Sequence, residues 1–287
     1  MKYQFIEDHR STYPVQRMCA VLEVSSSGYY AWRDRVPSQR TQENRELVKH
    51  MQIIHDKARH TYGSPRIHAE LLKQGFQVSR GRVHRLMKAN GIEPRRRKRY
   101  KKITTNAKHS YPVAENLLDQ DFTAEAPNLK WVADISYIPT QEGWLYLAAV
   151  MDLYSRRIVG WAMDAHLEAT LVEDALTMAI RQRRPGSDLL HHSDRGSQYA
   201  CHDYQALLKS HGMLASMSRT GNCYDNAVME SFFGSLKTEW VHHCNYPTRS
   251  QAKRDIFEYI EVFYNRERIH STLGYLSPHE YEALWSN

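Results

Sequence analysis

The order of apolar segments after about residue 126 restricts the fold of this chain more than any other feature. Three strand-like segments, at 131–138, 144–151 and 157–163, precede a helical segment at 168–182. Strand-like and helical segments then alternate, which is typical of α/β domains. The resulting order β-β-β-α-β-α-β-α predicts an RNase H-like fold. Its later elements are expected at 189–192, 203–210, 213–217, 224–241 and 249–265.

The part of the chain before this domain is predicted to form two small all-α units. Residues 1–38 contain short apolar clusters, and the aromatic residues Tyr29, Tyr30 and Trp32 are expected mainly in the core of this unit. Stacking of these rings on nucleic-acid bases is the alternative. Residues 39–92 predict three helices, and the last two, joined by a glycine-containing turn, match a helix-turn-helix pattern. These helices are expected at 41–59, 65–73 and 80–89.

Positive charge gathers in the last of these helices and in the segment that follows it. The helix is expected to lie in a major groove of DNA, with a solvated basic face as the alternative. Seven of the ten residues at 93–102 are basic, and their mutual repulsion predicts a phosphate-binding linker within the connection at 93–125. The candidate DNA contacts of these two segments are Arg80, Arg82, Arg85, Lys88, Arg95, Arg96, Arg97, Lys98 and Arg99.

The charge of the chain is divided unevenly between its two parts. Residues 1–110 hold 24 Lys and Arg against 9 Asp and Glu, whereas residues 111–287 hold 15 against 23. These differences, +15 and −8, sum to the net charge of +7. The balance favours a polyanion as partner of the first part and metal ions in the second. An uneven surface charge without a partner is the alternative.

Composition disfavours a membrane protein and a secreted protein. The sequence has no run of about 18 apolar residues, and its charged N-terminal segment is unlike a signal peptide. The four cysteines form no CxxC pair and are expected to be reduced thiols. We therefore expect a cytoplasmic protein with no membrane partner, associated with the nucleoid through DNA.

Three acidic residues stand in contexts that fit one kind of chemistry. Asp134 lies in the strand-like WVADISYI, Asp194 follows a short strand in HHSDRGSQY, and Glu230 lies on a helix in ESFFGSLKTE. An acid in an apolar strand is costly unless it is paired or bound to a metal. Carboxylates from two strands and a helix can converge on two Mg²⁺ ions that clamp the oxygens of a phosphodiester displacement. Lys237 shares the helical stripe of Glu230 and is expected to contact phosphate.

Other polar residues compete for roles near these acids. Asp225 is expected to cap the helix that carries Glu230, with a part in metal or substrate binding as the alternative. Asp152, at a strand end, is the main rival for the third acid. The C-terminal FYNRERIHSTLGYLSPHEY includes Arg268, and its polar residues either contact DNA or hold the last helix in place.

The motifs WVADISYI, HSDRGSQY and NCYDNAVMESFFGSLKTE resemble those of bacterial insertion-sequence transposases of the IS-three family, specifically the second-reading-frame product. HTYGSPRIHAELLKQGFQVSRGRVHRLMKANGI and YNRERIHSTLGYLSP fit the same family, so the resemblance covers most of the chain. It implies a retroviral integrase-type catalytic core at 126–287. It also implies that Asp134, Asp194 and Glu230 are catalytic, metal-binding acids of a DDE motif, with 35 residues between the last two.

The resemblance also implies a function. The chain is expected to be a Mg²⁺-dependent transposase, with Mn²⁺ as a substitute metal, that cleaves transposon ends and transfers the freed 3′-OH to target DNA. Its expected partners are double-stranded DNA, at terminal inverted repeats and target, further copies of itself, and the upstream-reading-frame product as fusion or partner. A cleavage-only metal-dependent nuclease and a DNA-binding regulator of transposition are the alternatives.

Overall fold

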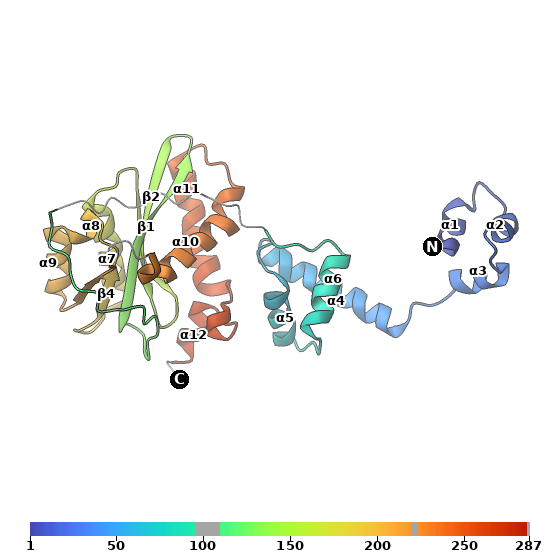
Figure 1. Cartoon of the computed structure of the whole chain (residues 1–287), viewed down its shortest axis with the longest axis horizontal. Helices are drawn as coiled ribbons and strands as arrows, with labels where there is room; N and C mark the ends of the chain where they lie inside the picture. Colours follow the sequence, from blue (N-terminus) through green and yellow to red (C-terminus); the bar gives the residue numbers. More distant parts are fainter. Residues whose placement is uncertain (96–109, 220–222, 286–287) are drawn as a thin grey trace.

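The structure, a computed structural model, describes residues 1–95, 110–219 and 223–285. Figure 1 shows three groups of elements along the longest axis: helices α1–α3 at one end, α4–α6 in the middle, and a sheet with its covering helices at the other end. Within the described residues, no helix has the length and apolar character needed to span a membrane.

The first group is a unit of three short helices, α1 (Lys2–His9), α2 (Val15–Val21) and α3 (Ser26–Arg33). Its small core consists of Ile6, Met18, Cys19 and Tyr29. Tyr29 is fully buried, whereas Tyr30 and Trp32 are 42% and 36% exposed. The predicted core role of the aromatic cluster is therefore confirmed for Tyr29 and wrong for the other two rings.

The second group consists of α4 (Gln39–Lys57), α5 (Ser64–Lys73) and α6 (Arg80–Ala89). Ser38 and Ser79 cap α4 and α6, since each hydroxyl accepts a hydrogen bond from the backbone N–H three residues later. Gly75, with φ of +87°, supplies the left-handed residue after α5. The third helix begins and ends at the predicted residues, and α5 and α6 form the predicted helix-turn-helix arrangement.

The third group is built on a five-stranded sheet with the order β3-β2-β1-β4-β5. Its strands are β1 (Lys130–Thr140), β2 (Gly143–Asp152), β3 (Ile158–Asp164), β4 (Leu190–Ser193) and β5 (Leu214–Met217). The first three strands are antiparallel neighbours, whereas β4 pairs parallel with β1 and β5 pairs parallel with β4. This order confirms the predicted RNase H-like fold.

The two faces of the sheet bury different residues because side chains alternate along each strand. Trp131 and Ala133 belong to a cluster covered by α7 (Ala169–Arg183), α8 (Ser197–Ala200) and α9 (His202–Ser210). Val132 and Ile138 belong to the opposite cluster, beneath the C-terminal helices. These are η1 (Cys223–Asn226), α10 (Ala227–Glu239), η2 (Val241–His243), α11 (Arg249–Phe257), η3 (Glu258–Glu267), η4 (Ser271–Leu273) and α12 (Pro278–Ala283). The short helix α8 has no counterpart among the predicted elements.

The predicted helix at 249–265 is an α-helix, α11, that continues as the π-helical stretch η3. In η3, the buried Asn265 accepts a hydrogen bond from the N–H of Ile158 and donates one to its carbonyl, each at 3.0 Å. Because one amide satisfies both backbone groups of a strand residue, it ties η3 to β3. Asn265 therefore holds the C-terminal segment in place.

Part of the predicted polar connection packs on the sheet. The N–H groups of Leu117 and Leu118 both donate to the hydroxyl of Ser216 in β5, at 2.9 and 3.2 Å. Leu118 is 2% exposed and joins the core. The segment just before β1 is thus anchored beside the parallel strands.

Helices α4–α6 contact the C-terminal helices of the sheet unit. Tyr62 accepts a hydrogen bond from the N–H of Ile269 at 2.9 Å, and Arg66 donates to the carbonyl of Ile269 at 3.0 Å. Arg59 forms an ion pair with Glu258 and lies over the ring of Trp240. The buried cores of the two units form one continuous cluster.

Candidate active site

Asp134 and Asp194 occupy matching positions on two neighbouring strands. The parallel register of β1 and β4 pairs Val132 with His192. Two residues further along each segment stand Asp134, still in β1, and Asp194, in the loop directly after β4. Adjacent strands lie about 4.8 Å apart. The two carboxylates therefore project from neighbouring positions in the interior of the sheet, one on β1 and one directly after β4.

Backbone N–H groups orient both carboxylates. Asp134 accepts a hydrogen bond from Ile135 at 2.8 Å, and Asp194 accepts one from Gly196 at 2.8 Å. Gly196 is the N-cap of α8, so the loop that holds Asp194 leads directly into this short helix. Both acids are half-buried, which limits the solvent available to stabilise their charge.

The surroundings of Asp134 disfavour its charged form. Burial raises the pKa of Asp134 well above its ordinary value, and the negative charges of Asp194 and Glu230 raise it further. The Ile135 N–H and the Lys237 ammonium lower the pKa of Asp134 without offsetting these effects. Acids held together against their repulsion are typical of functional sites that bind a cation.

Helix α10 carries two charged residues toward these acids. Glu230, in its first turn, is exposed, whereas Lys237, two turns later, is half-buried and lies 4.7 Å from the centre of the Tyr137 ring. Burial lowers the pKa of Lys237, and Asp134 raises it. The opposite face of α10 packs into the core through Met229, Phe232, Phe233 and Leu236. Glu230 and Lys237 thus lie on the side of α10 that faces the acids of the sheet.

The donor set suits a hard divalent cation, because it consists of carboxylate oxygens in a half-buried setting. In the described parts of the chain, however, no three acidic, histidine or cysteine side chains stand close enough together to hold one ion. Asp134 and Asp194 are the two acids that the strand register sets side by side, and the charge of Glu230 on α10 also acts on Asp134.

Asp225 differs from the helix cap that the sequence suggests. The N-cap residue of α10 is Asn226, and among the described residues no side chain caps this helix. The fully buried carboxylate of Asp225 accepts hydrogen bonds from the amides of Asn116 and Gln120. It also accepts from the Arg219 guanidinium, at 2.9 Å, and from the Arg219 N–H, at 2.7 Å. Asp225 therefore joins the segment before β1 to the start of α10.

Replacing Asp225 with asparagine is expected to lower the free energy of unfolding by about 2 kcal/mol, because hydrogen bonds to a charged group contribute roughly 1.5–3 kcal/mol. Arg219 holds the pKa of Asp225 well below its ordinary value. The charged form therefore stabilises the folded chain above pH of about 4, and this contribution is lost as the pH falls further. Urea denaturation at pH 7 and pH 3 tests this. A deficit that stays the same at both pH values would contradict the assignment.

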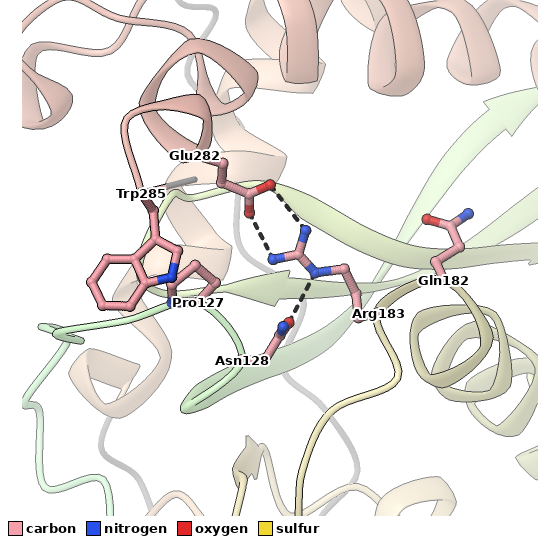
Figure 2. A pocket seen from close by; sticks show the side chains of 6 residues that line it. All are labelled: Pro127, Asn128, Gln182, Arg183, Glu282 and Trp285. Atoms are coloured by element: carbon pink, nitrogen blue, oxygen red, sulfur yellow. Dashed lines mark hydrogen bonds and ion pairs between the residues drawn. The ribbon is translucent and has the colours of Figure 1, made fainter. Parts of the chain in front are cut away.

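Asp152, the predicted rival for the third acid, belongs to a separate ion-pair network. It is fully buried and lies 3.3 Å from the Arg183 guanidinium. Arg183 also forms a two-pronged pair with Glu282 of α12 and donates to Asn128, as Figure 2 shows. In the strand register, Asp152 stands opposite Trp131 at the beginning of β1. It therefore holds α7 and α12 against the sheet, and this pairing argues against the alternative in which Asp152 is the third acid.

Tyr199 is a buried polar residue next to the Asp194 loop that the sequence analysis missed. It is 1% exposed, and its hydroxyl has no hydrogen-bond partner in the part of the chain that the structure describes. Burial raises the pKa of Tyr199, and Tyr204, Asp134 and Asp194 raise it further. Tyr199 lies in α8, which begins directly after the loop that holds Asp194. Its position five residues after Asp194, at the end of HSDRGSQY, is the signal that could have found it.

The cations of α6 face solvent with one exception. Arg80, Arg85 and Lys88 are exposed. Arg82 instead forms an ion pair with Glu43 at 3.2 Å and donates to Asn44 at 3.0 Å. Three of the four predicted DNA contacts on this helix are thus presented to solvent, whereas Arg82 joins α6 to α4.

Two further residues that were predicted to contact DNA instead form hydrogen bonds within the protein. Arg95 donates to the carbonyl of Glu239 at 2.7 Å. Arg268, 4% exposed, donates two hydrogen bonds of 2.7 Å to the Glu239 carboxylate. The prediction that Arg268 contacts DNA is therefore wrong, because its guanidinium neutralises a buried acid. The remaining predicted contacts, Arg96, Arg97, Lys98 and Arg99, lie outside the described residues.

Comparison with known families assigns both the helical unit and the sheet unit. Residues 42–100 match an HTH-like domain. Residues 124–223 and residues 230–284 match two descriptions of an integrase core domain. The second match begins at Glu230, so the two together cover all three candidate acids.

Similar proteins span nearly the whole chain. An uncharacterized 31 kDa protein of insertion element IS600 from Shigella sonnei is 48% identical and covers 91% of this chain and 96% of its own length. Transposase InsF for insertion sequence IS3A from Escherichia coli (strain K12) is 42% identical over 98% of both chains.

Solved structures of viral integrases are also similar, at low identity. A simian T-cell lymphotropic virus intasome in complex with PP2A regulatory subunit B56 gamma has a TM-score of 0.47 and 14% identity, covering 82% of this chain and 74% of that chain. The catalytic core domain of BIV integrase has a TM-score of 0.42 and 17% identity, covering 55% and 96%. By its full-length relatives and its matched domains, this chain belongs to the IS3 family of insertion-sequence transposases, which carry out DNA transposition.

Proposed function

We propose that this transposase cleaves transposon ends and joins them to target DNA at a site formed by Asp134, Asp194 and Glu230. The register of β1 and β4 carries this proposal, because it sets two carboxylates at matching positions on two adjacent strands. These acids would hold two Mg²⁺ ions, for which Mn²⁺ can substitute. When bound, such ions activate the attacking oxygen and stabilise the leaving oxygen of a phosphodiester displacement.

The residues around the acids position them and receive the DNA. The N–H groups of Ile135 and Gly196 fix the orientation of the two strand carboxylates. Lys237, which is half-buried and feels the charge of Asp134, would bind a phosphate oxygen of the DNA end as a point charge. Glu230 completes the acidic set from α10.

The proposed reaction is a direct displacement in two rounds, with no covalent protein intermediate. In the first round, a water molecule loses a proton, its oxygen bonds to a phosphorus at the transposon end, and the bond from that phosphorus to the 3′ oxygen breaks. The released 3′ oxygen takes up a proton. In the second round, the freed 3′-OH loses its proton and its oxygen bonds to a phosphorus of the target strand. The bond from that phosphorus to the 3′ oxygen of the target strand breaks, and that oxygen takes up a proton. Each round exchanges one phosphorus–oxygen bond for another.

The parts of the chain would divide the work. We assign residues 39–92 to binding of the terminal inverted repeats, 93–125 to a basic connection, and 126–287 to catalysis, with 1–38 as a separate helical module. Pairing of two DNA ends calls for at least two copies of the chain. The upstream-reading-frame product would join them as a fusion or as a partner, and the DNA substrate would place the assembly at the nucleoid.

A reaction with defined DNA ends tests the proposal. Purified protein is incubated with duplexes that carry the two ends of its own element, with Mg²⁺ or with EDTA, and the products are sequenced. We expect nicks at the ends and joined 3′ ends with Mg²⁺, and neither product with Asp194→Asn. Nicks without joining would support a cleavage-only nuclease, and binding without cleavage would support a regulator.

The exposed cations of α6 are expected to supply a large part of the DNA affinity. Each neutralised phosphate contributes about 0.9 to the slope of log K against log salt concentration. The double change Arg85→Glu and Lys88→Glu should therefore reduce this slope by about 2, measured by fluorescence anisotropy at several salt concentrations. Arg181→Glu with Lys209→Glu, an equal charge change at exposed positions of α7 and α9, is the control. Equal slopes for the two double variants would contradict a role of α6 in binding.

A further inference from the structure

Helix α3 of the N-terminal unit repeats the construction of helix α6. Ser25, like Ser79, stands before its helix and accepts a hydrogen bond from the backbone N–H three residues later, at 3.2 and 3.3 Å. Four residues after each serine lies a fully buried side chain, Tyr29 in α3 and Val83 in α6. The two helices therefore share their start and the position of their inward face.

The turn before α3 also resembles the turn before α6 in its backbone and packing. In each case the second residue after the preceding helix has a left-handed backbone, Glu23 with φ of +51° and Gly75 with φ of +87°. In each case the residue just before the capping serine is a half-buried valine that packs on the unit's core, Val24 or Val78. Two helices joined by a short turn of this kind form a helix-turn-helix. The N-terminal unit thus has the same local architecture, although its connection is two residues shorter.

The matching positions of the two second helices face solvent. Ser27, Tyr30 and Ala31 of α3 are exposed. At the same offsets from the capping serine, α6 exposes Gly81, His84 and Arg85. Figure 1 shows the N-terminal unit standing apart from the sheet unit, connected through the segment before α4. The exposed face of α3 is therefore open to an external ligand.

We propose that α2 and α3 form a second DNA-binding helix-turn-helix, in which α3 enters the major groove of the same DNA end that α6 contacts. This inference rests on the proposed DNA-end binding and extends it to a segment outside the matched HTH-like domain, which begins at residue 42. Duplex DNA is the ligand because the same local architecture in the same chain forms that domain. In such motifs the N-terminal residues of the second helix contact base edges.

The chemistry of the α3 face assigns it to sequence selection. α6 presents arginine and lysine, which bind phosphates regardless of sequence. α3 presents Ser27, Tyr30 and Ala31, and among these a serine hydroxyl can hydrogen-bond a base edge and an alanine methyl can contact a thymine methyl. The first 40 residues hold six Lys and Arg against four Asp and Glu, so this unit adds little net charge. α6 would thus supply affinity, and α3 selectivity.

The test uses the full chain and duplexes covering the ends of its element, with a scrambled duplex as competitor. Hydroxyl-radical footprints and the ratio of end affinity to scrambled affinity are measured at one salt concentration. Ser27→Glu with Ala31→Glu places two charges on the exposed face of α3. Ser11→Glu with Thr12→Glu places two charges at exposed positions between α1 and α2 and is the control. Tyr30→Ala tests the same face without a charge, and thermal unfolding shows that each variant folds.

We expect the wild type to protect two patches of the end. The α3 double variant should lose one patch and lower the selectivity ratio about tenfold or more, since one mismatched contact costs a similar amount. Tyr30→Ala should lower the same ratio, and the control should change neither readout.

Footprints and selectivity equal to those of the control would overturn the proposal, and so would a change confined to self-association, which would assign the face to a second copy. The variant Arg85→Glu distinguishes failure of the α3 proposal from failure of the proposed DNA-end binding. If Arg85→Glu removes a patch while the α3 variants do not, only the second motif is lost. If the wild type shows no preference for its ends, the proposed end binding fails as well.

Discussion

Replacing Asp134 with asparagine is expected to abolish cleavage and joining and, at the same time, to stabilise the metal-free protein at neutral pH. Loss of a carboxylate that holds the reactive centre should lower the rate by about three orders of magnitude or more, equal to roughly 4 kcal/mol of transition-state stabilisation. The gain in stability follows from the pKa of Asp134, which burial and the charges of Asp194 and Glu230 raise well above its ordinary value. A raised pKa means that the charged carboxylate destabilises the folded chain.

The pH dependence of the free energy of unfolding shows the direction of the predicted change in stability. The folded wild type binds a proton more tightly than the unfolded chain, so its free energy of unfolding falls as the pH rises from about 4 through the raised pKa of Asp134. Asparagine has no such titration. Urea denaturation without metal should therefore show Asp134→Asn more stable than wild type at pH 7, with the difference vanishing near pH 3.

Divalent metal should reverse this order, because binding to the folded state adds stability to the wild type alone. A rise in melting temperature with Mg²⁺ or Mn²⁺ is expected for the wild type and not for Asp134→Asn. Asp225→Asn is the comparison, since Asp225 is also buried but the Arg219 guanidinium lowers its pKa. This variant should lose stability at pH 7 in the absence of metal. If Asp134→Asn behaves in the same way, the two strand acids are not the repelling pair inferred from the structure.

Elements with strong local signals could be predicted from the sequence. Helix α6 begins after Ser79, whose hydroxyl caps it, and ends before the turn at Gly91, so both boundaries are determined by nearby residues. The strands of the sheet were predicted to within about two residues for the same reason, since their apolar runs are bounded by turns. The predicted positions of Asp134 within a strand and of Asp194 directly after a strand agree with the structure for the same reason.

Residues whose roles depend on long-range contacts could not be predicted in this way. Asp225 looks like a helix cap in the sequence, but its partners Asn116 and Gln120 lie more than 100 residues earlier. Arg268 looks like a DNA contact, but Glu239, 29 residues away, makes it part of the core. The sequence around Tyr199 has no charge pattern that would indicate its role. Local spacing cannot distinguish these cases, because only the packed structure shows which polar group meets which.

The end of α10 contacts both the C-terminal segment of the sheet unit and the helix-turn-helix unit. The Glu239 carboxylate accepts two hydrogen bonds from Arg268 and one from Tyr259, and it lies 3.7 Å from Arg66 of α5. The Glu239 carbonyl accepts one from Arg95. Burial alone would lower the pKa of Arg268, but the Glu239 carboxylate outweighs it and raises that pKa. One side chain thus joins the helix that carries Glu230, the C-terminal segment and the helix-turn-helix unit.

Replacing Glu239 with alanine is expected to lower the free energy of unfolding by about 3–5 kcal/mol, because it leaves the buried Arg268 charge without its counter-ion. Glu258→Ala is the matched control. It removes the acid of another contact between the same two units, the Glu258–Arg59 pair, whose side chains are 49% and 42% exposed. Exposed pairs contribute about 0–1 kcal/mol, so the control should change little in urea denaturation. Equal losses for the two variants would show that Glu239 is only one of many peripheral contacts. A loss confined to Glu239→Ala would show that the buried Glu239–Arg268 pair, and not the exposed Glu258–Arg59 pair, stabilises the end of α10.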